Sequence, residues 1–477
     1  MPFDPSFIPH EIWEEVFEWY CVDQRIPSRN LALVCRRWKQ ILLNHGILWR
    51  TIAIDLNAYG SIGSLRDRLA SRLSLAKGHT LDVILSNPLP MGLWPIRAQY
   101  KALFRNLLTI QAPVHRWYSL SINHGDFFRG DMGLVPEIFD GPFTSLRILS
   151  IGWHKTLIGL DVPNVLRFIQ RSNPPLRYLR IQFPFTAYPP CHITIPPTVA
   201  TLSVGHSFLE GVRLDAVPSL HEMEISGKYG AAYYPKPIDI TLLNTLKIQK
   251  CEVKVFNSLN VHNVRTLHID TLISWDHASE ISVDLPNLHT LHVRPCLPYY
   301  LKVFKAPRLE TVKLTGCHKS GSDEQLGVAR QENRIHTISL FHKRQHLLVI
   351  NPMSLTIEVD GITEGTLIAI LEAWPQLRHL SLIIGNHFDL PRVFAKQRRE
   401  RALLLCPQLE TMYIEVWWYA RGRKWRKWRE VARNLISSRN DRPLKSIIWK
   451  NKWFDVEALH DEADSAHRST SSETPEP

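Results

Sequence analysis

The stretch Leu288–Val293, LHTLHV, is followed by a second stretch with the same spacing, Leu309–Leu314, LETVKL. Each stretch has an apolar residue at its first, fourth and sixth positions. The last two apolar positions are separated by one residue, which is the period of a β-strand. The pattern therefore predicts short strands, each with one buried face.

The same triplet recurs along much of the chain and returns every 21 to 24 residues between Val199 and Leu309. A regular return at about 20 to 29 residues is the leucine-rich-repeat signature. The other copies are Leu146-Leu149-Ile151, Leu176-Leu179-Ile181, Val199-Leu202-Val204, Leu220-Met223-Ile225, Leu243-Leu246-Ile248, Val264-Leu267-Ile269, Ile335-Ile338-Leu340, Leu377-Leu380-Leu382, Leu409-Met412-Ile414 and Leu444-Ile447-Trp449. Weaker candidates stand at Trp117-Leu120-Ile122 and around Leu355-Ile357. Because one copy cannot bury its apolar face alone, we predict an α/β fold in which the copies form an irregular leucine-rich-repeat solenoid with a curved parallel sheet.

Residues around the triplets support this interpretation. Prolines precede several copies by two residues, where their missing donor does not disturb the strand: Pro174, Pro218, Pro286, Pro307, Pro375 and Pro407. Cysteines follow three copies at the position where the leucine-rich pattern has Asn or Cys: Cys251, Cys296 and Cys317. Apolar residues at helical spacing predict amphipathic return helices in two places: Val165, Phe168 and Ile169, and Leu367, Ile370, Leu371 and Trp374.

The residue between the last two apolar positions of each copy is expected to point away from the core. Small polar residues stand there in Ser150, Ser203, Ser339 and Ser381. Larger side chains, which we interpret as candidate target-binding residues, are Arg180, Glu224, Lys247, His268, His292, Lys313 and Tyr413. A solvated sheet face and a binding surface for a partner both fit this pattern, and the second is favoured because repeat proteins commonly bind there.

A different module precedes the repeats. In residues 7–50, Pro9 can open a helix that carries Ile12, Val16, Trp19 and Tyr20 at helical spacing. Ser28 can cap a short second helix, and a third segment places Val34, Trp38, Ile41 and Leu42 on one face. A unit this small buries too little surface to be comfortably stable alone. Its large apolar side chains are therefore expected to meet the repeats or another protein.

This module resembles an F-box. The resemblance is carried by the Ile8-Pro9-x-Glu11-Ile12 element, by Val16-Phe17, by Val34-Cys35-Arg36-x-Trp38 and by the closing Leu48-Trp49. The usual acidic turn after the first helix is replaced by Ile26-Pro27-Ser28. The segments Leu65–Leu85 and His115–Ile122 are also similar to F-box proteins of mushroom-forming fungi.

The resemblance implies a three-helix F-box and a substrate receptor of a Skp–cullin–F-box ubiquitin ligase. Its F-box would bind the Skp adaptor and, through this adaptor, a cullin. Its repeats would bind a target protein for ubiquitination and proteasomal degradation. The positions carried over as adaptor-binding are Ile8, Pro9, Ile12, Val16, Leu31, Val34, Cys35, Trp38, Leu48 and Trp49. Cys35 is expected to be a small packed residue rather than a nucleophile.

Composition narrows the class of protein. The chain has 477 residues, 44% of them hydrophobic, and a formal net charge of +12. It lacks a long uncharged apolar run, so no membrane span is expected. Its seven cysteines are odd in number and form no CxxC pair, which fits the reducing cytoplasm or nucleus.

We expect an F-box at 5–52, a linker with degenerate first repeats at 53–143, the solenoid at 144–459 and a disordered acidic tail at 460–477.

Competing functions remain open. Enzyme motifs for nucleotides, nucleophilic serine or zinc are not found, and no metal or cofactor is indicated, so we expect no enzyme. The basic segment Lys396–Arg433 mixes arginines with Trp425 and Trp428, which can bind nucleic acid. The same tryptophans fit the buried face of a helix, which we favour. The arginines of this segment could also bind an acidic or phosphorylated target. For the whole chain, the main alternative is a leucine-rich-repeat scaffold without a ubiquitin role.

Overall fold

The computed structural model consists of two compact units, Met1–Tyr234 and Pro235–Pro477. The structure describes residues 8–24, 28–55, 62–86, 112–122, 142–152, 173–182, 193–205, 212–214, 217–227, 238–240, 242–252, 255–256, 259–273, 282–294, 304–315, 351–359, 367, 371–384, 406–416, 446–451 and 454–458. The predicted long parallel sheet is confirmed, and helices are few among these residues.

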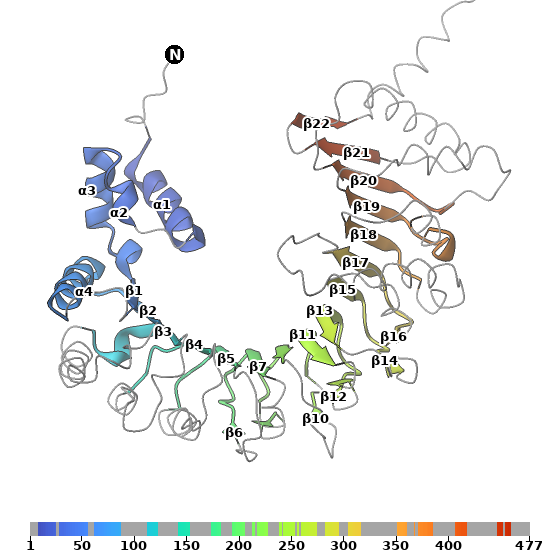
Figure 1. Cartoon of the computed structure of the whole chain (residues 1–477), viewed down its shortest axis with the longest axis horizontal. Coiled ribbons are helices and arrows are strands. Elements are labelled where there is room, and N and C mark those ends of the chain that lie inside the picture. Colours follow the sequence, from blue (N-terminus) through green and yellow to red (C-terminus); the bar gives the residue numbers. More distant parts are fainter. Residues whose placement is uncertain are drawn as a thin grey trace, which may run out of the picture. The chain divides into compact units, whose positions relative to one another are not determined.

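Unit 1 begins with helices and continues with parallel strands (Figure 1). Its helical elements are α1 (His10–Gln24), α2 (Ser28–Leu31), α3 (Arg36–Asn44), the 3-10 turn η2 (Gly46–Trp49), α4 (Ile62–Ala76) and the 3-10 turn η5 (Val114–Arg116). Its main strands, in spatial order, are β1 (Thr51–Asp55), β2 (Leu81–Ser86), β3 (Trp117–Ile122), β4 (Ile148–Gly152), β5 (Tyr178–Gln182), β7 (Thr201–Gly205) and β9 (Glu222–Ser226).

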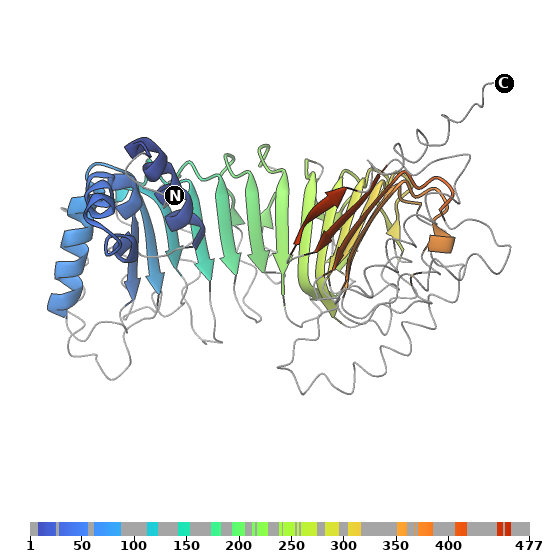
Figure 2. The same ribbon diagram turned by 90° about the horizontal axis from the view of Figure 1, so that it is seen from above.

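Unit 2 continues the same type of strand. Its main strands, in spatial order, are β11 (Thr245–Glu252), β13 (Thr266–Ile273), β15 (Thr290–Arg294), β17 (Thr311–Thr315), β18 (Ser354–Val359), β19 (His379–Ile384), β20 (Thr411–Val416), β21 (Ser446–Asn451) and β22 (Phe454–Ala458). All are parallel except β22, which pairs antiparallel with β21. Figure 2 shows the strands of each unit side by side.

Each repeat buries its apolar triplet as the spacing predicts. In β15, Leu291 and Val293 are buried while the residues between and beside them are half-buried or exposed. The first residue of the triplet, Leu288, lies before the strand and closes a turn by donating its N–H to the carbonyl of Leu285. Pro286 occupies the second position of that turn, where the fixed φ of proline is favourable.

The residue before the proline forms a fourth buried column that the triplet pattern does not include. Its members are Val217, Leu285, Ala306, Trp374 and Cys406, each almost fully buried. The position of Cys406 is therefore explained by packing, and its thiol donates to the carbonyls of Leu371 and Trp374. Cys251 is also buried, although it lies within β11 rather than in a turn after the strand.

Backbone hydrogen bonds join each repeat to the next before the strands begin. The carbonyl of Arg265 accepts from the N–H groups of both His289 and Thr290, at 2.8 and 3.0 Å. The carbonyl of His289 accepts in the same way from Glu310 and Thr311. The same two-donor arrangement joins β4, β5, β7 and β9 in unit 1 and β18, β19 and β20 in unit 2. It fixes the register in which identical positions of the repeats align.

The return segments contain short strands as well as helix. Three two-stranded parallel sheets are described: β6 (Ile193–Thr194) with β8 (Val212–Arg213), β10 (Ile238–Asp239) with β12 (Leu259–Asn260), and β14 (Val283–Asp284) with β16 (Phe304–Lys305). The predicted return helix near Trp374 is supported by helical residues 371–373 and by buried Leu367 and Leu371. The one predicted at Val165 to Ile169 lies outside the described residues.

The start of the sheet is a β–α–β unit. Strands β1 and β2 pair in parallel, and α4 connects them and packs against β1 and η2. Arg50 precedes β1 and places its Nε 2.8 Å from Oδ2 of Asp82 in β2. Burial raises the pKa of Asp82, although the nearby guanidinium opposes this effect. Residues assigned from the sequence to a linker and degenerate repeats thus contain α4, β2 and β3.

Strand pairing shows which of the predicted copies lies next to β17 in the sheet. Strand β17 pairs directly with β18, with Val312 opposite Leu355 and Leu314 opposite Ile357. The weaker candidate at Leu355 is therefore the strand that follows β17. The triplet Ile335-Ile338-Leu340, with Ser339, lies outside the described residues. So do Cys296, Cys317, the basic stretch after residue 416 and the predicted acidic tail, while the triplet Leu444-Ile447-Trp449 leads into β21.

Replacing Leu291 with Ala should destabilise unit 2 by about 2–5 kcal/mol, because a fully buried side chain leaves a cavity that cannot collapse. Urea unfolding followed by circular dichroism measures this change. The matched control is Thr290→Ala at the half-buried neighbouring position, which should change the free energy of unfolding by less than about 1 kcal/mol. Equal effects of the two substitutions would contradict the assigned strand register.

Candidate functional site

The N-terminal helices pack around a small aromatic core. Phe17, Ile41, Leu42 and Leu48 are buried, and Trp13, Leu31, Trp38 and Trp49 are among the residues that pack around them. The ring centroids of Trp13 and Trp38 are 4.8 Å apart, and those of Phe17 and Trp38 are 4.9 Å apart in an edge-on arrangement. The core therefore uses α1, α2, α3 and η2 together.

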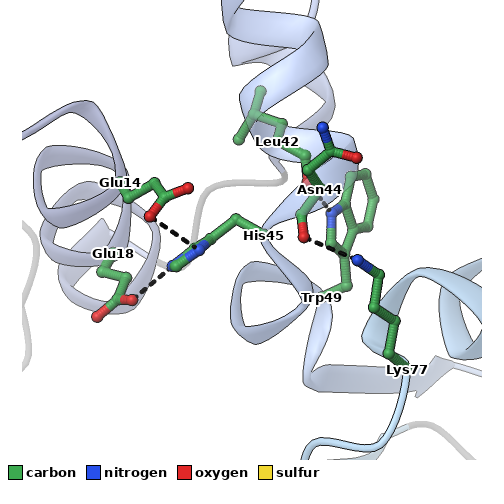
Figure 3. Close-up of polar contacts among 7 residues, drawn as sticks. All are labelled: Glu14, Glu18, Leu42, Asn44, His45, Trp49 and Lys77. Atoms are coloured by element: carbon green, nitrogen blue, oxygen red, sulfur yellow. Dashed lines mark hydrogen bonds and ion pairs between the residues drawn. The ribbon is translucent and has the colours of Figure 1, made fainter. Parts of the chain in front are cut away.

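Polar contacts connect these elements at their ends (Figure 3). His45, which follows α3, places Nε2 2.6 Å from Oε1 of Glu18 and Nδ1 3.5 Å from Oε2 of Glu14, both on α1. Trp49 donates its indole N–H to the carbonyl of Leu42 at 2.7 Å. The contacts of His45 hold α1 against the end of α3, and the bond from Trp49 holds η2 against α3.

The same module is attached to the beginning of the sheet. Lys77, just after α4, donates to the carbonyl of Asn44 at 2.9 Å (Figure 3). Gly46 lies so close to His79 that a Cβ at this position would come within 2.7 Å of the imidazole. A larger residue here, where η2 meets the turn after α4, would therefore have to push the exposed imidazole of His79 aside. Within unit 1, the module is a packed part of the fold rather than a loosely linked domain.

Cys35 has a different role from the one expected. It is exposed rather than packed, because it is the N-cap of α3 with an extended backbone. Its Sγ accepts a hydrogen bond from the backbone N–H of Trp38 at 3.4 Å. The thiol therefore satisfies one of the free donors at the start of the helix.

Several large apolar side chains of the module remain exposed. Ile12, Val16 and Trp19 are 48%, 44% and 68% exposed, and their i, i+4, i+7 spacing places them on one face of α1. Leu33 and Val34, in the turn between α2 and α3, are 79% and 60% exposed. The inward face of α1 carries Trp13 and Phe17 instead, so this helix has two apolar faces and only one is covered.

The structure divides the predicted adaptor-binding residues into two groups. Those with exposed or half-buried side chains near the surface are Ile8, Pro9, Ile12, Val16, Val34 and Cys35. Those that pack in the core are Leu31, Trp38, Leu48 and Trp49. Exposed Trp19, Leu33 and Leu43 are not among the predicted site residues. For Trp19, the signal is present in its helical spacing from Ile12 and Val16.

The candidate target-binding residues align across the strands of each unit. In unit 1, Arg180 lies between Ser150 and Ser203, and Glu224 follows Ser203. Ser203 is buried, contrary to expectation, although it lies on the outward face. Nε2 of Gln182 donates to the hydroxyl of Ser203 at 3.4 Å, and Oε1 of the same amide accepts from Arg180 at 2.7 Å.

In unit 2, four consecutive strands place Lys247, His268, His292 and Lys313 in one row, which we call the basic row. The Nδ1 atoms of His268 and His292 are 3.2 Å apart, and Nε2 of His292 is 2.9 Å from Oγ1 of Thr315. Burial, and then His268, Lys313 and Arg294, lower the pKa of His292 to about 4, while Asp270 opposes them. At neutral pH His292 is therefore uncharged.

Farther along the same face, Ser381 and Tyr413 continue the alignment. Tyr413 donates its hydroxyl to Oε2 of Glu415 at 2.7 Å. Burial, followed by Glu415, raises the pKa of Tyr413 to about 12, so this side chain remains a neutral donor. The end of this alignment is apolar, because exposed Ile448 of β21 lies opposite Tyr413.

The described parts of the chain contain neither a metal-binding cluster nor a membrane-spanning helix. No cluster of three or more His, Cys, Asp or Glu side chains able to hold a metal ion occurs in them. Among the same residues there is also no helix long and apolar enough to cross a membrane.

Comparison with known families gives one match. Residues 6–55 match the family described as F-box-like, so an F-box-like domain occupies the helical module and β1. No curated protein matches the chain. F-box domains generally bind the Skp adaptor, and the domain suggests an adaptor role in a ubiquitin ligase.

The cap of α3 gives a prediction for local stability. Cys35→Ser should slow hydrogen exchange of the first turn of α3 relative to Cys35→Ala, by an amount equivalent to about 0.5–2 kcal/mol, because a hydroxyl is a better cap acceptor. Hydrogen exchange of peptides covering residues 35–44, measured by mass spectrometry, tests this. Equal protection in the two variants would show that the side chain at this position does not cap the helix.

The depressed pKa of His292 predicts a dependence of stability on pH. As pH falls from about 6.5 towards about 4, the unfolded chain binds a proton at His292 that the folded chain does not, so the free energy of unfolding decreases. His292→Asn should lose less stability than the natural chain between about pH 7.5 and about pH 5, as measured by urea unfolding. The idea fails if both proteins lose the same amount.

Proposed function

We propose that this protein is a substrate-recognition subunit of a Skp–cullin–F-box ubiquitin ligase. In this proposal, the F-box-like domain at residues 6–55 binds the Skp adaptor and, through it, the cullin. The strand faces of the following leucine-rich-repeat solenoid capture a target protein in the cytoplasm or nucleus. The target is then ubiquitinated and degraded by the proteasome.

The observation that carries the proposal is the uncovered apolar face of α1. Ile12, Val16 and Trp19 are adjacent on one helix face and are substantially exposed, while the other apolar face of the helix is fully used in the core. Large apolar side chains gathered on one exposed helix face are typical of a protein interface. Exposed Leu33 and Val34 add apolar surface in the same domain.

The proposed mechanism requires no catalytic residue in this chain. A receptor that binds a target and, through the adaptor, the ligase holds the target lysines near the ubiquitin-loaded carrier. Ubiquitin transfer becomes faster because the effective concentration of the target at the carrier reaches about the millimolar range for short connections. A module packed onto the first strands suits this role, because α4 contacts both η2 and β1 and Lys77 donates to the carbonyl of Asn44.

Target capture by the strand faces rests on the side chains that they present. Polar and charged residues at matching positions of successive repeats line the outward face, whereas the inward face is apolar and buried. A continuous row of side chains with fixed spacing can contact an extended segment of another protein at several points. The candidate residues Arg180, Glu224, Lys247, His268, His292, Lys313 and Tyr413 belong to these faces.

Substitutions on the exposed face of α1 test the proposal. The double variant Val16→Glu and Trp19→Glu should weaken binding of the purified Skp adaptor at least tenfold, because two charged groups replace apolar side chains at the interface. Isothermal titration calorimetry with the full chain measures the affinity. The matched control is Leu242→Glu in unit 2, which is 57% exposed and should leave adaptor binding unchanged.

Circular dichroism and hydrogen exchange of residues 35–44 establish that the variant remains folded. Leu48 is unsuitable for this test because it is buried in the module core, and a charge there would unfold the helices. If the natural chain does not bind the Skp adaptor, or if the double variant binds as tightly as the natural chain, the proposed role of this face is wrong.

A further inference from the structure

We propose that the basic row of unit 2 binds an extended acidic segment of the target protein, with carboxylates at alternate positions, that runs across the strands. This inference deepens the proposed function, because it names the class of target segment that the strand face recognises. It concerns unit 2 alone and does not require that the adaptor be bound.

The register of the sheet sets the positions of the side chains. Successive strands pair the members of the row in order: β11 carries Lys247, β13 His268, β15 His292 and β17 Lys313. Neighbouring strands are about 4.8 Å apart, so the two lysine positions are separated by about 14 Å. The two histidines lie between them, and their midpoint is about 7 Å from either lysine position.

This spacing matches an extended peptide lying perpendicular to the strands. Such a peptide rises about 3.3 Å per residue, and alternate side chains that point to the same face are about 7 Å apart. Acidic residues at positions i, i+2 and i+4 therefore span about 13–14 Å. They would meet Lys247, the histidine pair and Lys313 in turn.

The charges around the histidine pair favour an anion. Burial is the largest cause of the lowered pKa of His292, and nearby His268, Lys313 and Arg294 lower it further because positive charge disfavours a second cation there. Asp270 is the acidic group that opposes them, and it lies between Gln249 and Arg294 in the next row of the face. A carboxylate or another anion placed on the row relieves the repulsion among these cations.

The histidine pair can respond to the ligand. Their Nδ1 atoms are 3.2 Å apart, so one ring can donate a hydrogen bond to the other, while Nε2 of His292 lies 2.9 Å from Oγ1 of Thr315. A bound carboxylate stabilises an additional proton on the pair. Binding of the acidic segment is therefore expected to be tighter at lower pH. The other charged groups that lie near the pair on this face are Lys247, Lys313, Arg294 and Asp270.

The test uses the full chain and two fluorescein-labelled synthetic peptides of equal composition. One peptide has the sequence Ser-Glu-Ser-Glu-Ser-Glu-Ser, and the other has its three glutamates contiguous. Fluorescence anisotropy at low salt should give an affinity for the alternating peptide at least about fivefold higher than for the contiguous one. Its affinity should rise at least about threefold from about pH 7 to about pH 5, towards the lowered pKa of His292, and fall with added salt.

Charge reversals then locate the site. Lys247→Glu and Lys313→Glu should each weaken binding of the alternating peptide at least tenfold. The matched control Lys305→Glu makes the same change on an exposed lysine of β16, outside the row, and should alter the affinity by less than twofold. His268→Gln together with His292→Gln should remove the dependence on pH. Circular dichroism of each variant checks its folding.

Three results would overturn the proposal. One is equal affinity for the two peptides, and another is binding that Lys247→Glu and Lys313→Glu leave unchanged. The third is binding that occurs only after residues 459–477 are removed, because the row would then belong to the chain's own acidic segment, which contains Asp461, Glu462 and Asp464. Loss of adaptor binding in the α1 variants has no effect on these measurements, so the two proposals fail separately.

Discussion

The constraint on which the fold depends is that no repeat can bury its leucines by itself. Each strand offers one apolar face, and that face is covered only when the preceding and following strands stand in register, as Leu267, Leu291 and Val312 do. The shared carbonyl that joins consecutive repeats, such as that of Arg265, fixes this register before the strand begins. Burial of the inward columns and the fixed alignment of outward side chains are thus consequences of the same geometry.

The helical module satisfies a similar requirement with fewer residues. Its core contains Phe17, Ile41, Leu42 and Leu48, with tryptophans around them, and its last residues continue into β1. Strand β1 lies within the span that matches the F-box-like family, so the domain supplies the first strand of the sheet. The domain gains support from the sheet, while one apolar face of α1 remains uncovered.

The sequence predicts the inward columns well, because the spacing of the triplets directly reports which side chains face the core. The strength of the match does not decide which copy pairs next, because Leu355-Ile357 is a weaker match and yet lies in β18, which pairs directly with β17. The triplet pattern misses the column at Trp374 and Cys406, because its members vary in size and share only a following proline. The burial of Ser203 is also not predictable from the sequence pattern, because the strand period does not show which outward side chains are covered by their neighbours.

The candidate site shows the same division between pattern and environment. The F-box resemblance identifies the correct segment, yet Val34 and Leu48 are equally apolar in sequence and have opposite environments in the structure. Separating them requires the three-dimensional packing of α1, α3 and η2. The small size of Cys35 predicts packing, whereas its position before α3 makes it a cap. The histidine pair also depends on register, since His268 and His292 meet only when β13 and β15 align.

The direct pairing of β17 with β18 has a further consequence for how the chain can change. Thr311 pairs with Ser354 at the same register position at which Thr290 pairs with Thr311. The connection to Ser354 is much longer, because residues 316–350 lie between β17 and β18. The entropy needed to close a connection rises only slowly with its length. Insertions at this point are therefore tolerated by the sheet, and new sequence can be added there over generations, or by an engineer, without rebuilding the scaffold.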